Sequence, residues 1–213
     1  MDYWQVKKSK DEAKRDLIRT IKERTGEELD EKKLTIVIPR RITSQKGFDI
    51  LIKLLKDIVK ERTSDGLGAQ VILLGKAHEN DVVGKEWVRE FERLNEELKN
   101  GFVFIEGFDL EIAKIMYWGG DLGFYPSVPD KEPCGTGYMV ALVNQVPTIA
   151  TDTGGVVDTI EEFDVKTMKG NGFKISKQNY SSQSFWNKLK IASDIYYKHP
   201  EKWKRLMENC LKT

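Results

Sequence analysis

The chain has few of the residues that build disulfide frameworks and metal centres. Its 213 residues include only two cysteines, Cys134 and Cys210, and only two histidines, His78 and His199. The cysteines lie far apart and lack the spacing of zinc ligands, so neither a disulfide scaffold nor a zinc site is predicted. So few histidines also give little support to metal or serine–histidine chemistry, and we expect no metal and no other cofactor.

Long apolar runs and an excess of one charge sign are missing as well. Lys and Arg total 35 against 34 Asp and Glu, a balance without general attraction for nucleic acid or an anionic membrane. No apolar run approaches the roughly 18 residues of a membrane span, and the start, Met1-Asp2-Tyr3-Trp4, has no signal-peptide pattern. We therefore expect a cytoplasmic protein without nucleic-acid or membrane partners, in which any anion site is local.

Short apolar runs with strand character alternate along the chain with segments of helical period. Strands are predicted at Leu34 to Ile38, Ala69 to Leu74, Phe102 to Ile105, Leu122 to Tyr125, Pro147 to Ala150 and Gly172 to Ile175. Helices are predicted from a capping-box pattern at Ser9 and Glu12 to a stop at Gly26, and over 48–59, 86–98, 110–118, 138–144, 156–160, 184–197 and 200–211. This alternation predicts an α/β fold over residues 1–213, a single Rossmann-like domain whose doubly wound parallel sheet has helices on both faces.

The residues suited to binding follow the predicted strands at one edge of the sheet, where ligands bind in such folds. Arg41 and Lys46 follow the first strand, Gly75 the second, Phe108 the third, Glu132 with Gly135 and Gly137 the fourth, and Thr153, Gly154 and Gly155 the fifth. Because the carboxyl ends of parallel strands meet at the same edge, this convergence predicts a site for a phosphate-bearing ligand.

The stretch from Glu132 to Ala141 lies at the centre of that edge. Two glycines, Gly135 and Gly137, separate a strand from a segment that can be helical. Backbone N–H groups and the positive end of a helix dipole suit a phosphate there, and a carboxylate beside it can hold sugar hydroxyls. A phosphate next to a sugar suggests a nucleotide sugar, whereas a plain tight turn before a packed helix is the alternative.

Several nucleotide-binding motifs are missing. There is no glycine-rich motif ending in Gly-Lys-Ser or Gly-Lys-Thr, which disfavours a P-loop nucleotidase, and no Gly-x-Gly-x-x-Gly after the first strand, which disfavours a nicotinamide dehydrogenase. No Asp-x-Asp pair is placed to hold a divalent metal on a diphosphate. Arg41, Lys46 and backbone dipoles would have to meet that charge.

Three segments resemble a known family in their order and nearly in their spacing. Arg41-Ile42-Thr43-Ser44-Gln45-Lys46-Gly47, Glu132-Pro133-Cys134-Gly135 and Thr153-Gly154-Gly155 look like the hallmark segments of bacterial, archaeal and plant glycogen and starch synthases. The resemblance implies a retaining glucosyltransferase of the GT-B type, built of paired Rossmann-like domains. Such an enzyme passes glucose from ADP-glucose or UDP-glucose to the nonreducing end of an α-1,4-glucan.

The resemblance also implies roles for single residues. Arg41 and Lys46 would neutralise the departing diphosphate, and Glu132 would hold the donor glucose, which makes these three the catalytic candidates. The implied donor-binding residues are Gly75, Phe108, which would stack on adenine, Cys134, Gly135, Thr136, Gly137, Tyr138, Thr153, Gly154 and Gly155. The chain departs from the family where Thr136-Gly137 replaces a pair such as Leu-Thr, and where Val140 replaces a second glutamate of related transferases.

No counterpart of the family's N-terminal acceptor domain is found in the sequence. We therefore expect the donor-binding half of a synthase, which binds its donor weakly by itself and does not transfer glucose to the α-glucan acceptor. The alternatives are another GT-B enzyme, such as a sucrose or trehalose synthase or a glucan phosphorylase, and a non-catalytic nucleotide-sugar-binding module. A lysine that would anchor the pyridoxal phosphate of a phosphorylase could not be assigned.

Overall fold

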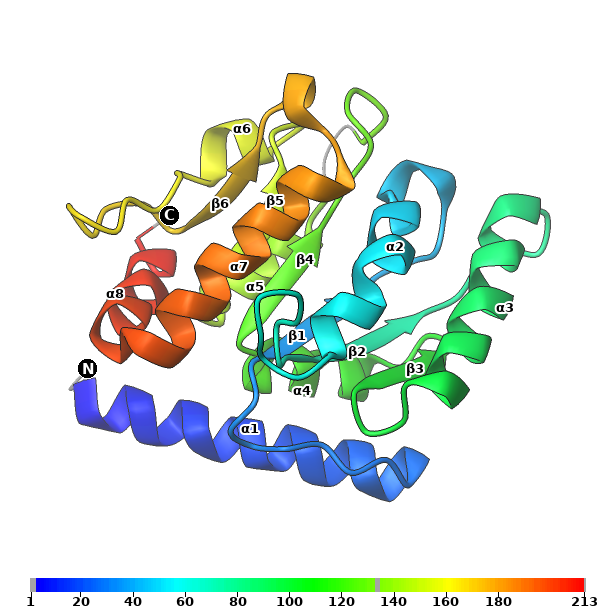
Figure 1. The fold of residues 1–213 in the computed structure, drawn as a ribbon, viewed down its shortest axis with the longest axis horizontal. Helices are drawn as coiled ribbons and strands as arrows, with labels where there is room; N and C mark the ends of the chain where they lie inside the picture. The colour runs from blue at the N-terminus through cyan, green and yellow to red at the C-terminus, as the bar shows by residue number, and fades with distance from the viewer. Residues whose placement is uncertain (1–2, 133–134, 213) are drawn as a thin grey trace.

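The computed structural model describes residues 3–132 and 135–212, and a parallel sheet lies at the centre of this part of the chain (Figure 1). Its strands are β1 (Thr35–Pro39), β2 (Gln70–Gly75), β3 (Phe102–Glu106), β4 (Leu122–Tyr125), β5 (Thr148–Thr151) and β6 (Gly172–Ile175), in the order β3-β2-β1-β4-β5-β6. Every run predicted as a strand forms one, with ends shifted by at most one residue. The predicted Rossmann-like fold is confirmed.

The strand order places a change of direction between β1 and β4. From β1 the chain adds β2 and then β3 on one side, and it returns to place β4 on the other side, where Ile36 pairs with Leu122. The connections on either side of this point leave in opposite directions, so a crevice opens beyond the carboxyl ends of β1 and β4. The site described below lies there.

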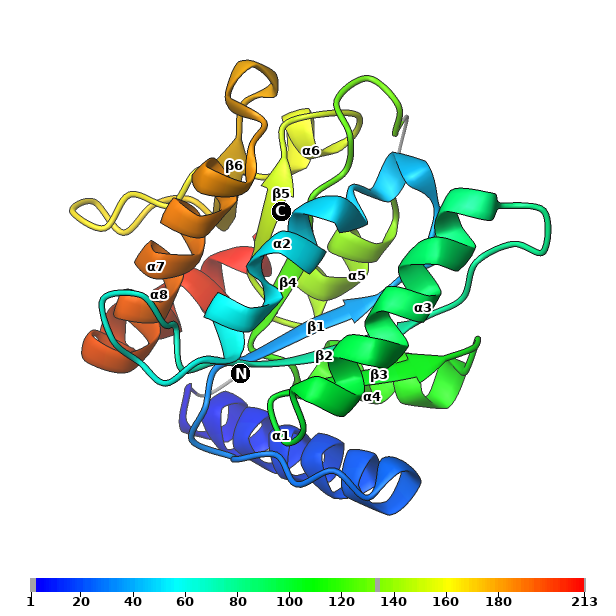
Figure 2. The same cartoon turned by 45° about the vertical axis from the view of Figure 1, so that its right-hand side comes forward.

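Helices cover both faces of the sheet (Figures 1 and 2). One face carries α2 (Phe48–Val59), α3 (Val82–Glu97) and α7 (Ser182–Lys198), and the other carries α1 (Tyr3–Thr25), α4 (Leu110–Gly119) and α5 (Gly137–Val143). The shorter elements are α6 (Val156–Thr159), α8 (Pro200–Cys210) and the 3₁₀ turns η1 (Ser44–Lys46) and η2 (Lys177–Asn179). Each face has its own apolar core, with Leu51 and Phe185 in the first and Leu17 and Met116 in the second.

The first helix starts earlier than predicted. α1 begins at Tyr3, so Ser9 lies inside the helix and does not cap it. The residues before Ser9 include no proline or glycine, and a capping-box pattern within such a run does not stop the helix from extending further. Its end at Thr25, before Gly26 at φ 78°, agrees with the predicted stop.

An ion pair buried in the fold fixes α1 against the sheet. The Lys14 ammonium lies 2.5 Å from Asp121 Oδ2 and also donates to the carbonyl of Lys33. The same Asp121 oxygen accepts the backbone N–H of Thr35 at the start of β1. One carboxylate therefore ties α1, β1 and the entry to β4 together.

Two helix starts show what capping contributes. Asp109 accepts the N–H groups of Glu111 and Ile112 and so caps the start of α4. α3 begins at Val82 rather than at Glu86, because Asp81 accepts the N–H of Gly84 and starts the helix one turn earlier.

Candidate functional site

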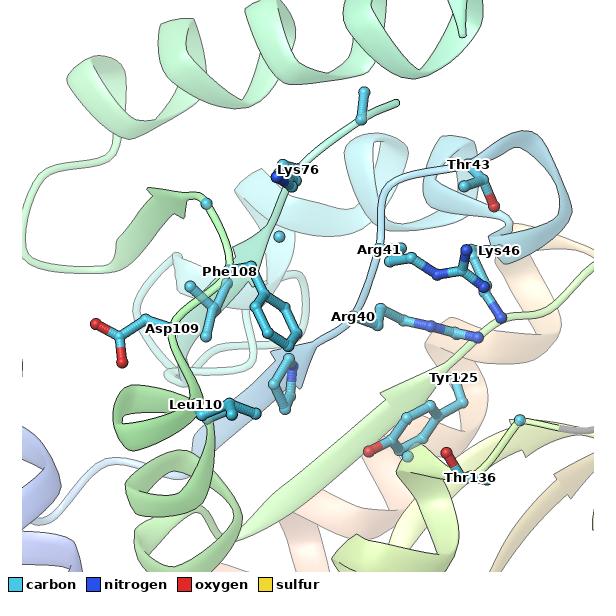
Figure 3. Close-up of a pocket in the computed structure, with 18 of the residues that line it drawn as sticks. Arg40, Arg41, Thr43, Lys46, Lys76, Phe108, Asp109, Leu110, Tyr125 and Thr136 are labelled. Atoms are coloured by element: carbon cyan, nitrogen blue, oxygen red, sulfur yellow. The ribbon is translucent and has the colours of Figure 1, made fainter. Parts of the chain in front are cut away.

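A cavity of about 580 Å³ opens at the carboxyl edge of the sheet. Its walls come from the residues that follow β1, β2 and β3, from Tyr125 at the end of β4 and from the turn that leads into α5. Figure 3 shows Arg40, Arg41 and Lys46 on one side of this space and Phe108 with Leu110 on the other. The cavity therefore has a cationic side and an apolar side.

The cationic side depends on the tight turn after β1. Lys46 ends η1 and is only 7% exposed, whereas Arg41 is exposed to solvent. Gly47 follows at φ 67°, and a Cβ there would lie 1.8 Å from the carbonyl oxygen of Pro126. Because only glycine permits that approach, the turn packs against the loop after β4 and brings Lys46 to the residues of that loop.

Glu132 is the carboxylate that Lys46 meets there. Glu132 is 7% exposed, and its Oε2 accepts a hydrogen bond from the Lys46 ammonium. Burial lowers the pKa of the Lys46 amine, and the charges of Arg40 and Arg41 lower it further, while Glu132 acts in the opposite direction. The predicted catalytic candidates Arg41, Lys46 and Glu132 thus line one cavity.

Phe108 supplies an aromatic face on the opposite side. It follows β3 and Gly107, lines the cavity and is 74% exposed. Most phenylalanines of the chain are buried, so a face left open beside a cavity is available to a flat ligand group.

Only some of the predicted donor-binding residues around the turn before α5 line the cavity. Gly135, Thr136 and Gly137 line the cavity, as does Gly75. Tyr138 is buried and packs edge-on against Tyr125, with ring centroids 6.3 Å apart. Cys134 lies outside the described residues.

The two glycines of that turn differ in their surroundings. A Cβ on Gly135 would come no closer than 3.8 Å to another residue, whereas one on Gly137 would lie 3.0 Å from the Tyr117 hydroxyl. The packing of the described residues therefore favours a glycine at 137, where an added Cβ would be crowded, and places no such restriction on 135. α5 has only seven residues, and we assign most of the local positive potential to the arginines and Lys46 rather than to its dipole.

The segment after β5 does not line this cavity. Thr153 is buried, and its hydroxyl accepts the backbone N–H of Asp130 in the loop after β4. Thr153, Gly154 and Gly155 thus follow a neighbouring strand of the sheet but are not among the cavity-lining residues. A role for them in the donor pocket stays a prediction.

Arg40 was missed as a site residue. It lines the cavity, and its guanidinium lies 3.5 Å from Glu132 Oε2 and over the ring of Tyr125. The sequence signal for Arg40 is its place directly after β1, beside Arg41. Tyr125 ends β4, and the sequence pattern predicts it only as a strand residue.

Within residues 3–132 and 135–212, no group of His, Cys, Asp and Glu side chains is arranged to hold a metal ion. In the same residues, no helix combines the length and apolar character needed to cross a membrane.

Comparison with known proteins gives a consistent picture. The chain is 30% identical over 173 residues to the glycogen synthase of Thermotoga maritima and 30% identical over 185 residues to that of Bacillus cereus. These matches cover 81% and 86% of this chain but 32% and 35% of the relatives, so the chain spans about a third of their length.

Solved structures show the same fold. The catalytic domain of starch synthase IV from Arabidopsis thaliana, bound to ADP and acarbose, superposes with a TM-score of 0.78 and 26% identity, over 96% of this chain and 39% of that one. The Anabaena protein HepE, in complex with UDP and glucose, shares the fold with a TM-score of 0.67 and 21% identity, over 92% of this chain and 47% of its own.

The resemblance to glycogen and starch synthases expected from the hallmark segments is thus confirmed. The sequence pattern of the family described as "Glycosyl transferases group 1" matches residues 20–207. Because this match extends over nearly the whole chain and the fold agrees, the chain belongs to the group 1 glycosyl transferases.

Proposed function

We propose that this chain is the donor-binding domain of a glucosyltransferase of the glycogen and starch synthase type. The single observation that carries the proposal is the cavity in which Arg41 and Lys46 lie across from the open face of Phe108, with the Glu132 carboxylate hydrogen-bonded to Lys46. A nucleotide sugar has the matching parts, namely a diphosphate, a sugar and a flat base.

The diphosphate occupies the cationic side in this proposal. Arg41 and Lys46 neutralise the charge that grows on the diphosphate as its bond to the glucose C1 breaks, and such charge-assisted bonds are stronger than neutral ones. The proposal needs no metal, because these cations supply the positive charge. We expect addition of EDTA to leave ADP binding unchanged.

Glu132 and Phe108 hold the other parts of the donor. The Glu132 carboxylate accepts hydrogen bonds from glucose hydroxyls and fixes the sugar beside the diphosphate. Phe108 stacks on the base, an interaction that tolerates different bases because each has a flat face. The choice between ADP-glucose and UDP-glucose therefore depends on contacts to the edge of the base.

The transfer step also needs an acceptor. In the proposed reaction, the 4-hydroxyl at the nonreducing end of an α-1,4-glucan forms a bond to C1 and loses its proton, and the nucleoside diphosphate leaves with the bonding electrons. The resemblance implies net retention of configuration at C1. The acceptor groove would lie in a further domain, as the share of its relatives that this chain spans suggests.

A thermal-shift comparison tests donor binding. ADP, UDP, ADP-glucose, UDP-glucose, AMP and free glucose are compared at matched millimolar concentration, since a ligand that binds the folded state raises the midpoint of unfolding. We expect the diphosphates and their glucose conjugates to raise it and AMP to have a smaller effect. Equal shifts for AMP and ADP would contradict a diphosphate site.

Transfer activity is tested separately. We expect the 213-residue chain, incubated with labelled ADP-glucose or UDP-glucose and a glucan, to bind donor without elongating the glucan. Elongation by this chain alone would contradict the need for a further domain.

A cytoplasmic location is part of the proposal, and the low cysteine content favours a reducing compartment.

A further inference from the structure

Arg40 is a buried cation that the proposed donor contacts leave unexplained. It follows β1 directly, and its side chain is only 8% exposed. Its guanidinium carbon lies 5.2 Å from the centre of the Tyr125 ring, and its Nη2 lies 3.2 Å from the hydroxyl of Ser127. These contacts hold the guanidinium in the wall of the cavity, next to Glu132.

The second terminal nitrogen of Arg40 is not used. Nη1 is shielded from solvent and has no hydrogen-bond partner among residues 3–132 and 135–212. A buried donor without a partner is destabilising, and burial lowers the pKa of this guanidinium. An arrangement in which Nη1 gains a partner would remove that cost, and the Glu132 carboxylate lies 3.5 Å from the neighbouring nitrogen, Nη2.

Glu132 is already occupied by Lys46. Its Oε2 accepts the hydrogen bond from the Lys46 ammonium and lies 3.5 Å from Arg40 Nη2. One carboxylate oxygen is therefore shared by two cations, close to one and more distant from the other. An ammonium that turns away from Glu132 brings its whole charge to a diphosphate, whereas one that stays paired shares that charge with the carboxylate.

Release of Lys46 leaves Glu132 with a buried negative charge. Breaking a buried ion pair by removing one partner is strongly destabilising. The cost is met if a second cation closes on the carboxylate as the first one leaves, and Arg40 has both the position and the unused N–H groups to do so.

We propose that Arg40 is a positioning residue that takes over the Glu132 carboxylate when Lys46 turns to the diphosphate. This inference rests on the proposed function, because it needs a diphosphate at Lys46. Arg40 does not touch the ligand itself: it holds Glu132 in place for the sugar and frees the charge of Lys46. The site thus exchanges one ion pair for another when the donor binds.

A double-mutant cycle tests this exchange. ADP binding is measured by calorimetry for the wild type, Arg40→Gln, Glu132→Gln and the double variant. We expect Arg40→Gln to weaken ADP binding by about tenfold or more, because Lys46 then remains the only counter-ion of Glu132. We expect Glu132→Gln to bind ADP at least as tightly as the wild type, since Lys46 is no longer held.

The double variant separates the proposal from a direct contact. If Arg40 acts through Glu132, adding Arg40→Gln to Glu132→Gln changes the ADP affinity by less than about threefold. The same large loss in both backgrounds would mean that Arg40 contacts the ligand, and it would overturn the inference. An Arg40→Gln variant that binds ADP like the wild type would overturn it as well.

Two controls keep the outcome interpretable. Arg89→Gln removes the same charge from an exposed position in α3 outside the cavity and should leave ADP affinity unchanged. Should Arg40→Gln fail to fold, Glu132→Gln alone still decides, because a tenfold loss of ADP affinity in that variant contradicts a restraining role for Glu132. If the wild type itself binds no ADP, the proposed function fails. If the wild type and Arg40→Gln bind ADP with the same affinity, only the exchange of ion pairs is refuted.

Discussion

The ammonium of Lys46 forms an ion pair with the Glu132 carboxylate, although the two residues are 86 positions apart in the chain. Lys46 comes from the turn after β1 and Glu132 from the loop after β4, the two strands between which the chain reverses direction across the sheet. The fold thus brings together a cation suited to a diphosphate and a carboxylate suited to a sugar at the position where α/β sheets bind ligands.

Removal of the cations tests the diphosphate role. We expect Lys46→Ala and Arg41→Ala each to weaken ADP binding by about tenfold or more, because each removes a charge-assisted bond. Calorimetric titration measures this effect. Lys53→Ala, which removes a charge from an exposed position of α2, is the matched control and should have no effect. Unchanged affinity in both cavity variants would rule out a phosphate role for them.

Phe108→Ala tests whether the apolar side holds the base. Stacking of a base on an aromatic ring contributes about 1–3 kcal/mol, so we expect ADP affinity to fall by about tenfold while inorganic pyrophosphate binds as before. Trp118→Ala removes another exposed aromatic side chain, one outside the cavity, and should bind ADP normally. An equal loss for ADP and pyrophosphate in Phe108→Ala would show that the ring does not contact the base.

Alanine substitutions at Gly135 and Gly137 separate loss of space for the ligand from crowding within the protein. A Cβ on Gly135 meets nothing closer than 3.8 Å, so we expect Gly135→Ala to keep its unfolding midpoint but to lose about tenfold in ADP affinity, because the added methyl group occupies ligand space. Gly137→Ala should instead lower the midpoint, since its Cβ would lie 3.2 Å from the ring of Tyr125. Normal ADP binding by Gly135→Ala would exclude a close approach of the ligand to that backbone.

The ion pair between Lys14 and Asp121 predicts a large effect far from the cavity. Asp121→Asn leaves the buried Lys14 ammonium without its counter-ion, which we expect to lower the free energy of unfolding by about 3–5 kcal/mol. Asp16→Asn breaks the exposed pair with Arg19 and should change it by less than about 0.5 kcal/mol. Urea unfolding measures both, and similar small effects would argue against burial of the first pair.

Lys10 and Cys210 predict opposite dependences of stability on pH. Burial lowers the pKa of Lys10 from 10.5 to about 8 and raises the pKa of Cys210 from 9.0 to about 12. Between about pH 8 and 10.5 the unfolded chain keeps the lysine proton that the folded protein has lost, so stability rises with pH. Between about pH 9 and 12 the unfolded chain loses the thiol proton first, so stability falls.

Single variants separate these two contributions. From pH 9 to 10, Cys210→Ala should gain stability relative to the wild type, and Lys10→Met should lose stability relative to it, each by about 1 kcal/mol per pH unit. Urea unfolding of each protein at pH 9 and pH 10 gives the change in its free energy of unfolding between the two pH values. Any effect of a substitution that is the same at both pH values cancels from this difference. Parallel pH profiles for the variants and the wild type would contradict the shifted pKa values.

The sequence was most informative where local pattern and burial agree. The apolar runs of β1 to β6 are short and bounded by polar or turn residues, so their places were predictable to within one residue. The strand order was not, because the side on which a strand joins the sheet depends on packing between distant segments. The starts of α1 and α3 differed from the prediction as well. α3 begins at the cap Asp81, and α1 continues back to Tyr3 because no helix-breaking residue precedes Ser9.

Several residues of the candidate site were predictable from the sequence, but the contacts between them were not. Position after a strand was enough to select Arg41, Lys46, Phe108 and Glu132, which line one cavity. It could not reveal that Arg40 would turn toward Glu132, because that contact joins residues far apart in sequence. Nor could it distinguish Tyr138, which packs into the core, from the glycines beside it that line the cavity.

The central claim, that this cavity holds a nucleoside diphosphate, is tested most directly by a crystal structure of the protein soaked with ADP. We predict density for the diphosphate within hydrogen-bonding distance of the Lys46 ammonium, with the adenine against Phe108 and the Lys46–Glu132 contact opened. A cavity that stays empty at saturating ADP, or a diphosphate bound elsewhere on the protein, would contradict the account.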